Sequence, residues 1–193
     1  MGNINRIESA YEFYRNHIFE ESLFQILDAH GLKVAGSVHP VKWELFGSFL
    51  TGAAGTGNTG ADLDGWEVKS AGSGNSYEYQ YHLNTGLEKL REDAVVNHVF
   101  CSYSPKYDEV EVWVAQGKYL TEKYFSKWIP LYQLNYDQSV DPKQRRQRFR
   151  KSISHSYVKK VGGMVLRIAK GELVYTHNEV LIKYSNNIPD EFR

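Results

Sequence analysis

The stretch Ala61-Asp62-Leu63-Asp64-Gly65-Trp66-Glu67-Val68-Lys69-Ser70 joins a glycine-containing turn to a short strand with an acid and a lysine two positions apart. Successive side chains of a strand point to opposite faces, so Glu67 and Lys69 share one face and the apolar Val68 points to the other. The pattern therefore predicts a strand with one face for chemistry and one for packing.

Asp62 lies just upstream of this strand, in a bend that Gly60 and Gly65 favour, so its carboxylate can turn toward Glu67. Magnesium keeps several waters and takes one or two protein carboxylates together with phosphate oxygens. Asp62 and Glu67 are therefore predicted to bind Mg²⁺. Lys69 is then placed to orient or deprotonate the attacking water, or to neutralise charge developing on phosphorus. The alternative is an ordinary edge strand with solvated charges.

The order of Asp62, Glu67 and Lys69 resembles the active-site signature of the PD-(D/E)XK nuclease superfamily. From Gly57 to Ala115 the sequence resembles type II restriction endonucleases of the PvuII kind, while the gap of four residues between Asp62 and Glu67 looks more like the MvaI type. The resemblance implies a restriction-endonuclease-like α/β fold, with a mixed central β-sheet flanked by helices. It also makes Glu44 a candidate metal ligand, for which the alternative is a solvated helix glutamate.

A strand predicted over Tyr77–His82 alternates tyrosine with polar side chains. The tyrosines share one face and are expected to pack, while Gln80, His82 and the following Asn84 form a polar set. The resemblance places this set near bases in the major groove, and amide side chains can pair bidentately with adenine. The alternative is the polar outer face of an edge strand.

The net charge is zero, with 23 Lys and Arg against 23 Asp and Glu, yet the segment from Pro142 to Lys170 contains Lys and Arg but no Asp or Glu. A segregated basic stretch is typical of a protein that binds a polyanion. A solvated tail is the alternative. The predicted DNA contacts in this stretch are Lys143, Arg145, Arg146, Arg148, Arg150 and Lys151.

Hydrophobic periodicity places further elements along the chain. Helices are predicted over 4–30, 40–50, 85–96 and 118–128, the last ending at Ile129-Pro130. Strands are predicted over 97–103 and 109–115, the second nearer an edge of the sheet, and over 164–168 and 180–184. The single Cys101 lies in an apolar strand and is predicted to be a small buried hydrophobe.

These observations predict one domain over 1–193, with a helical segment (1–50), a catalytic core (51–128) and a basic DNA-binding part (129–193). The predicted function is that of a type II restriction endonuclease: Mg²⁺-dependent cleavage of double-stranded DNA at a specific site. Two alternatives are a mismatch-repair nicking or junction-resolving nuclease of the same fold, and a non-catalytic DNA-binding module.

A homodimer is favoured because such DNA sites are usually palindromic, and a monomer is the alternative. The segment Thr51–Gly60 lacks a Gly-Lys-Ser/Thr ending, which argues against a nucleotide cofactor. No apolar run approaches the roughly 20 residues of a membrane span. A prokaryotic, cytoplasmic protein without a membrane partner is therefore expected.

Overall fold

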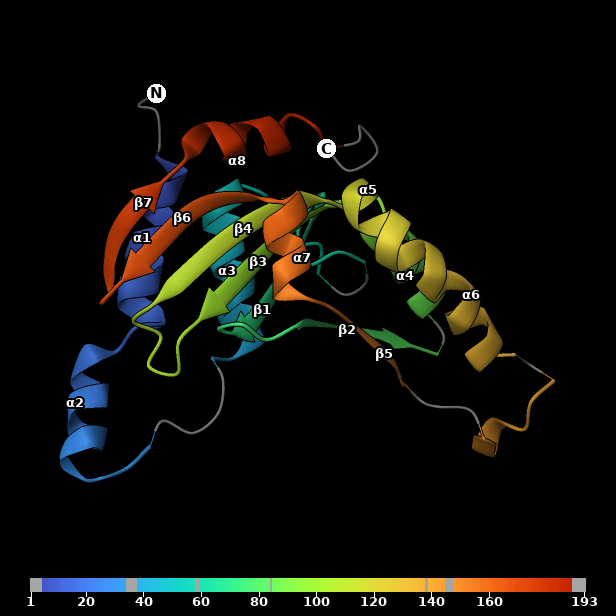
Figure 1. Ribbon diagram of the computed structural model, residues 1–193, viewed down its shortest axis with the longest axis horizontal. Coiled ribbons are helices and arrows are strands. Elements are labelled where there is room, and N and C mark those ends of the chain that lie inside the picture. The colour runs from blue at the N-terminus through green and yellow to red at the C-terminus, as the bar shows by residue number, and fades with distance from the viewer. Residues whose placement is uncertain are drawn as a thin grey trace.

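A mixed sheet of five strands lies at the centre of the molecule (Figure 1). The computed structural model describes residues 5–33, 38–57, 60–83, 85–137, 139–144 and 148–188. In spatial order the strands are β1 (Trp66–Gly72), β3 (Asn97–Tyr103), β4 (Val110–Gln116), β6 (Gly163–Ala169) and β7 (Glu172–Thr176). β1 runs parallel to β3, and all other neighbours are antiparallel. This arrangement confirms a mixed α/β fold with a central sheet.

A separate ribbon of two antiparallel strands extends beside the central sheet (Figure 1). It pairs β2 (Tyr77–His82) with β5 (Arg148–Ile153), so the predicted strand of alternating tyrosines exists but belongs to this second sheet. The three tyrosines of β2 are buried, whereas Glu78 and His82 are exposed. The ribbon therefore has an apolar inner face and a polar outer face.

Helices cover both faces of the central sheet. Figure 1 shows α1 and α3 behind the sheet, α7 in front, α5 at the end of β4, and α4 and α6 beside the ribbon. Their bounds are α1 (Arg6–His17), α2 (Glu21–Ala29), α3 (Pro40–Thr51), α4 (Gly86–Asp93), α5 (Gly117–Leu120), a π-helical turn (Thr121–Phe125), α6 (Ser126–Asn135), a 3-10 turn (Pro142–Gln144), α7 (His155–Val161) and α8 (Asn178–Ser185).

The two faces of the sheet enter two separate hydrophobic clusters. Val99 and Cys101 of β3 pack with α1 and α3, and the buried Cys101 confirms its predicted packing role. Phe100, between them, points to the other face and packs with the ribbon tyrosines, α4 and α6. β3 thus packs against the helices α1 and α3 with one face and against the ribbon with the other.

The predicted helix over 4–30 is two helices within its described part. α1 ends at His17 and α2 begins at Glu21. The break turns the buried Phe19 back onto Tyr14, with ring centroids 5.8 Å apart. Burial of these aromatic side chains outweighs the gain from continuing the helical hydrogen bonds.

The prediction that Ile129-Pro130 ends a helix is wrong, because α6 continues through Pro130 to Asn135. Proline in a helix interior costs roughly 3 kcal/mol. Trp128 and Tyr132 lie on either side of it and are buried in the second cluster, which offsets that cost.

Two strand predictions also need correction. Residues 180–184 form part of helix α8, in which Leu181 and Tyr184, three apart, are buried against the sheet. β4 is the middle strand rather than a near-edge one. Apolar and polar side chains alternate along the first part of β4 because α7 covers the polar face. There Lys159 of α7 donates a 2.9 Å hydrogen bond to Glu111. Polar positions of a central strand can therefore be satisfied by a covering helix.

Candidate active site

A tight turn delivers Asp62 to the beginning of β1. Leu63 and Trp66 exchange two backbone hydrogen bonds of 2.9 Å, and Gly65 between them has a φ of 72°, which favours glycine. The Asp62 carboxylate then accepts a 2.9 Å hydrogen bond from the backbone N–H of Val68. The turn therefore folds Asp62 back along the strand, as the sequence predicted.

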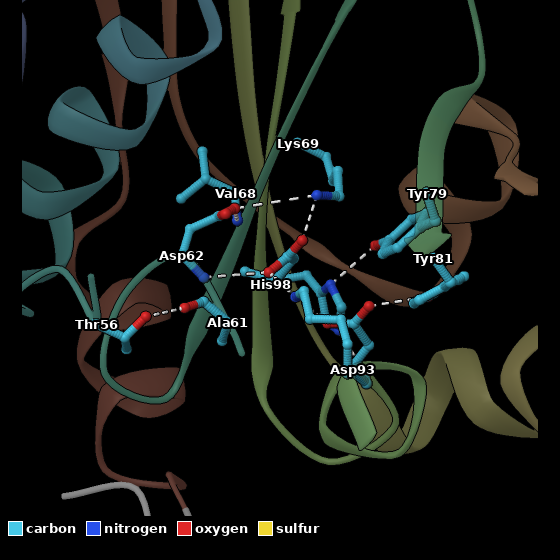
Figure 2. Close-up of polar contacts among 11 residues, drawn as sticks. Thr56, Ala61, Asp62, Val68, Lys69, Tyr79, Tyr81, Asp93 and His98 are labelled. Atoms are coloured by element: carbon cyan, nitrogen blue, oxygen red, sulfur yellow. Dashed lines mark hydrogen bonds and ion pairs between the residues drawn. The ribbon is translucent and has the colours of Figure 1, made fainter. Parts of the chain in front are cut away.

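Glu67 and Lys69 lie side by side on β1, and the Lys69 ammonium donates to Oε1 of Glu67. The same ammonium lies 4.0 Å from Oδ2 of Asp62 (Figure 2). Glu67 is 1% exposed, and its Oε2 accepts a 3.2 Å hydrogen bond from the Asp62 backbone N–H. The structure thus brings together all three residues of the predicted catalytic set.

Two residues of α4 extend this site, and sequence analysis did not single them out. Lys89 donates to Oε2 of Glu67 and, at 2.7 Å, to Oδ1 of Asp93. Tyr81 of β2 donates a 2.8 Å hydrogen bond to the other oxygen of the buried Asp93. In the sequence, Lys89 and Asp93 have the i,i+4 spacing of a solvated helix pair, and only the docking of α4 buries them.

His98 of β3 joins the same buried polar cluster. Its Nε2 lies 2.7 Å from the carbonyl oxygen of Asp93, which can only accept, so Nε2 carries the hydrogen. Nδ1 then accepts from the Tyr79 hydroxyl at 2.8 Å. Burial lowers the pKa of His98 to about 4, which fits this neutral form. The Tyr79 ring in turn lies 5.1 Å from the Lys69 ammonium.

Burial and neighbouring charges separate the pKa values of the acids. Burial opposes ionisation of Glu67, but the ammonium groups of Lys69 and Lys89 outweigh it and lower the pKa of Glu67 to about 2. Burial and the Glu67 charge raise the pKa of Asp62 to about 6 and that of Asp93 to about 7. Although burial disfavours its charge, Lys69 has a raised pKa because Glu67 and Asp62 stabilise the ammonium form. At neutral pH Glu67 is therefore an anion and Lys69 a cation.

The donor set fits a hard divalent cation. Two carboxylates converge on one positive group, the Lys69 ammonium, and magnesium needs only one or two protein carboxylates. Within the described residues no group of three or more His, Cys, Asp or Glu could hold a metal ion. Glu44 is half-buried on α3 and makes no hydrogen bond or ion pair there with Asp62 or Glu67. Its role as a ligand stays a prediction.

The polar face of the ribbon gathers the other predicted side chains. Gln80 pairs across the strands with Arg150, and His82 pairs with Arg148. Arg150 Nε donates a 3.1 Å hydrogen bond to Oε1 of Gln80, and both arginines are exposed. The pairing of β2 with β5 thus brings the polar set of β2 next to the basic segment. No local sequence pattern predicts this pairing, and the two sets were predicted separately.

Two other predicted DNA contacts, Lys143 and Lys151, are described by the structure and lie away from the outer face of the ribbon strands. Lys151 lies on the inner side of β5, half-buried, with its ammonium 5.2 Å from the Phe149 ring centroid. Lys143 is exposed in the 3-10 turn. Asn84, Arg145 and Arg146 lie outside the described residues.

No helix in the described part of the chain has the length and apolar character needed to span a bilayer. Comparison of the sequence with protein-family models and with curated proteins finds no match.

Proposed function

We propose that the protein is a type II restriction endonuclease that hydrolyses DNA phosphodiester bonds at a specific sequence and requires Mg²⁺. One observation carries the proposal: Asp62, Glu67 and Lys69 converge on one point beside a ribbon whose exposed face combines amide and guanidinium groups. A restriction-endonuclease-like version of the α/β fold belongs to the same proposal.

Asp62 and Glu67 would hold the metal ion through their carboxylates. When bound, Mg²⁺ supplies positive charge at the scissile phosphate and lowers the pKa of the attacking water. Because Lys69 is a cation in this site, it is suited to orient that water and to neutralise charge growing on the phosphate oxygens. Proton abstraction by Lys69, the other role considered from sequence, would first require loss of its proton.

The ribbon is suited to the recognition step. A two-stranded antiparallel ribbon fits the major groove of B-DNA, where Gln can pair with adenine and Arg with guanine. Gln80, His82, Arg148 and Arg150 project from one face of this ribbon. The opposite face is anchored by buried tyrosines, so the recognition side chains stand on a rigid support. A symmetric homodimer would place one such unit on each DNA strand.

Two other functions fit parts of these observations. A mismatch-repair nicking or junction-resolving nuclease would use the same catalytic residues but would cut by structure rather than by sequence. A non-catalytic DNA-binding module would use the ribbon alone. The buried ion pairs around Glu67 favour an enzyme, since burying several charges is costly and such clusters are found preferentially at active sites.

The test is digestion of a plasmid of known sequence with Mg²⁺, followed by mapping of the ends. Discrete double-strand breaks at one sequence are expected. Glu67→Gln and Lys69→Met should each reduce cleavage by a factor of about 10² or more while DNA binding in Ca²⁺ persists. Lys106→Met, at an exposed ion pair with Asp28, is the matched control and should cleave normally. DNA binding without cleavage would favour the binding module, and structure-dependent nicks would favour the other nuclease.

A further inference from the structure

The two oxygens of the Glu67 carboxylate have different partners. Oε1 accepts from Lys69, whose ammonium also lies 4.0 Å from the Asp62 carboxylate, and Oε2 accepts from Lys89 and from the Asp62 backbone N–H. One oxygen therefore contacts the predicted catalytic lysine, and the other is held by a lysine on a different element. A carboxylate bound in this way cannot rotate without breaking contacts to an ammonium group.

We propose that Lys89 is a positioning residue of the active site, which holds Oε2 of Glu67 and thereby fixes Oε1 in the direction of the metal ion and the scissile phosphate. This inference rests on the proposed nuclease function. Lys89 contacts Oε2 and Asp93, and the proposal assigns it no contact with substrate. Hydrogen bonds to ligating carboxylates typically change metal affinity or activity 10–100-fold when removed.

Lys89 is itself held by its surroundings. Its side chain is 20% exposed, and Asp93 accepts from it at 2.7 Å while Tyr81 fixes Asp93 at 2.8 Å. α4 can approach β2 this closely because of Gly86, where an added Cβ would lie 2.9 Å from Cβ of Tyr81. A chain of contacts thus links Glu67 on β1 to Lys89 and Asp93 on α4, and these to Tyr81 on β2, the strand that carries Gln80 and His82.

A merely structural role for Lys89 would be to balance the buried charge of Asp93. The variant Lys89→Met removes the ammonium and leaves Asp93 buried without its partner, so it is expected to unfold at lower temperature. The double variant Lys89→Met/Asp93→Asn removes that unpaired charge as well. If balancing were the only role, the double variant would regain both stability and function.

The experiment compares wild type, both variants and a control, Lys159→Met, which breaks another lysine–glutamate contact between a helix and a strand. Four quantities are measured: the thermal midpoint, Mn²⁺ affinity by calorimetry without DNA, DNA affinity in Ca²⁺, and kcat in Mg²⁺. In the double variant we expect a recovered midpoint and DNA affinity within about twofold of wild type. Its Mn²⁺ affinity and kcat are expected to stay about 10–100-fold lower.

A folded double variant with wild-type Mn²⁺ affinity and kcat would overturn the role of Lys89, as would a loss of equal size in the control. Wild-type protein that binds Mn²⁺ but cleaves no DNA would reject the proposed function alone, and the comparison of metal affinities would still decide the role of Lys89. Wild-type protein that binds no Mn²⁺ would overturn both.

Discussion

The cluster around Glu67 and the outer face of the ribbon are built from the same kinds of side chain, acids with basic partners, and differ in their contact with water. Glu67 and Asp93 are buried, and their lysine partners are mostly covered. Arg150 and Glu78 on the ribbon are more than half exposed and lie 3.8 Å apart. In the buried cluster every carboxylate oxygen of Glu67 and Asp93 has a donor, whereas the ribbon can exchange its internal contacts for contacts with a ligand.

The largest effect on stability is expected from breaking the buried cluster. Asp93→Ala removes an acceptor of Lys89 and leaves the Tyr81 hydroxyl without its carboxylate. Leaving the buried Tyr81 hydroxyl without an acceptor costs about 1–3 kcal/mol, and loss of the Lys89–Asp93 contact adds to this. Urea unfolding at neutral pH measures this free energy, and a loss below about 1 kcal/mol would show that water reaches the cluster.

The pH dependence of stability tests whether Asp93 is buried as deeply as the structure shows. The raised pKa of Asp93, about 7, means that the folded state holds this proton more tightly than the unfolded chain. Its stabilising contribution is complete below the ordinary carboxyl pKa near 4 and is lost as pH rises through 7. Asp93→Asn cannot titrate, so its stability relative to wild type should improve from pH 4 to pH 7 without metal. Parallel profiles of the two proteins would assign Asp93 an ordinary pKa.

On the ribbon the expected effects are smaller and concern recognition. If Gln80 reads a base edge, Gln80→Ala should reduce discrimination between cognate DNA and a one-base mismatch by about 1–3 kcal/mol. Both duplexes are measured in Ca²⁺, which blocks cleavage. Ser152→Ala, an exposed position on the same face of β5, is the control. Equal losses on both duplexes would mean that Gln80 only positions the DNA backbone.

The smallest change in stability is expected for Arg150→Ala. An exposed ion pair contributes about 0–1 kcal/mol, so unfolding should hardly shift. DNA binding is a more sensitive measure, because a lost phosphate contact lowers the slope of log K against log salt by roughly 0.9. An unchanged slope would place Arg150 away from phosphates, and a loss on cognate DNA alone would assign it to base recognition.

The part of the site that depends on one strand could be predicted from sequence. Glu67 and Lys69 share a face because of the period of two, and a glycine turn returns Asp62 to them. Lys89 could not be found in this way, because nothing local indicates that α4 docks with its charged side against β1. The pairing of Gln80 with Arg150 is equally non-local, since the two residues are 70 positions apart.

The fold predictions succeeded where a local pattern determines the element and failed where long-range packing does. β3 and α3 could be predicted from the sequence, because the first contains a continuous apolar run and the second is an apolar-rich segment between Pro40 and Gly52. Residues 180–184 are rich in β-branched side chains, yet contacts of Leu181 and Tyr184 with the sheet determine a helix. The helix through Pro130 is likewise determined by packing that the local sequence does not reveal.

The pairing of β2 with β5 also bears on how the protein is made. During synthesis β2 emerges long before its partner, and closing so long a loop must precede any gain from the contacts between the strands. Until Arg148–Ile153 leaves the ribosome, β2 lacks its partner strand, and its three tyrosines lack the cover of Phe149 and Ile153. A nascent chain that stalls in this interval exposes an aromatic strand edge, which is prone to association with other chains.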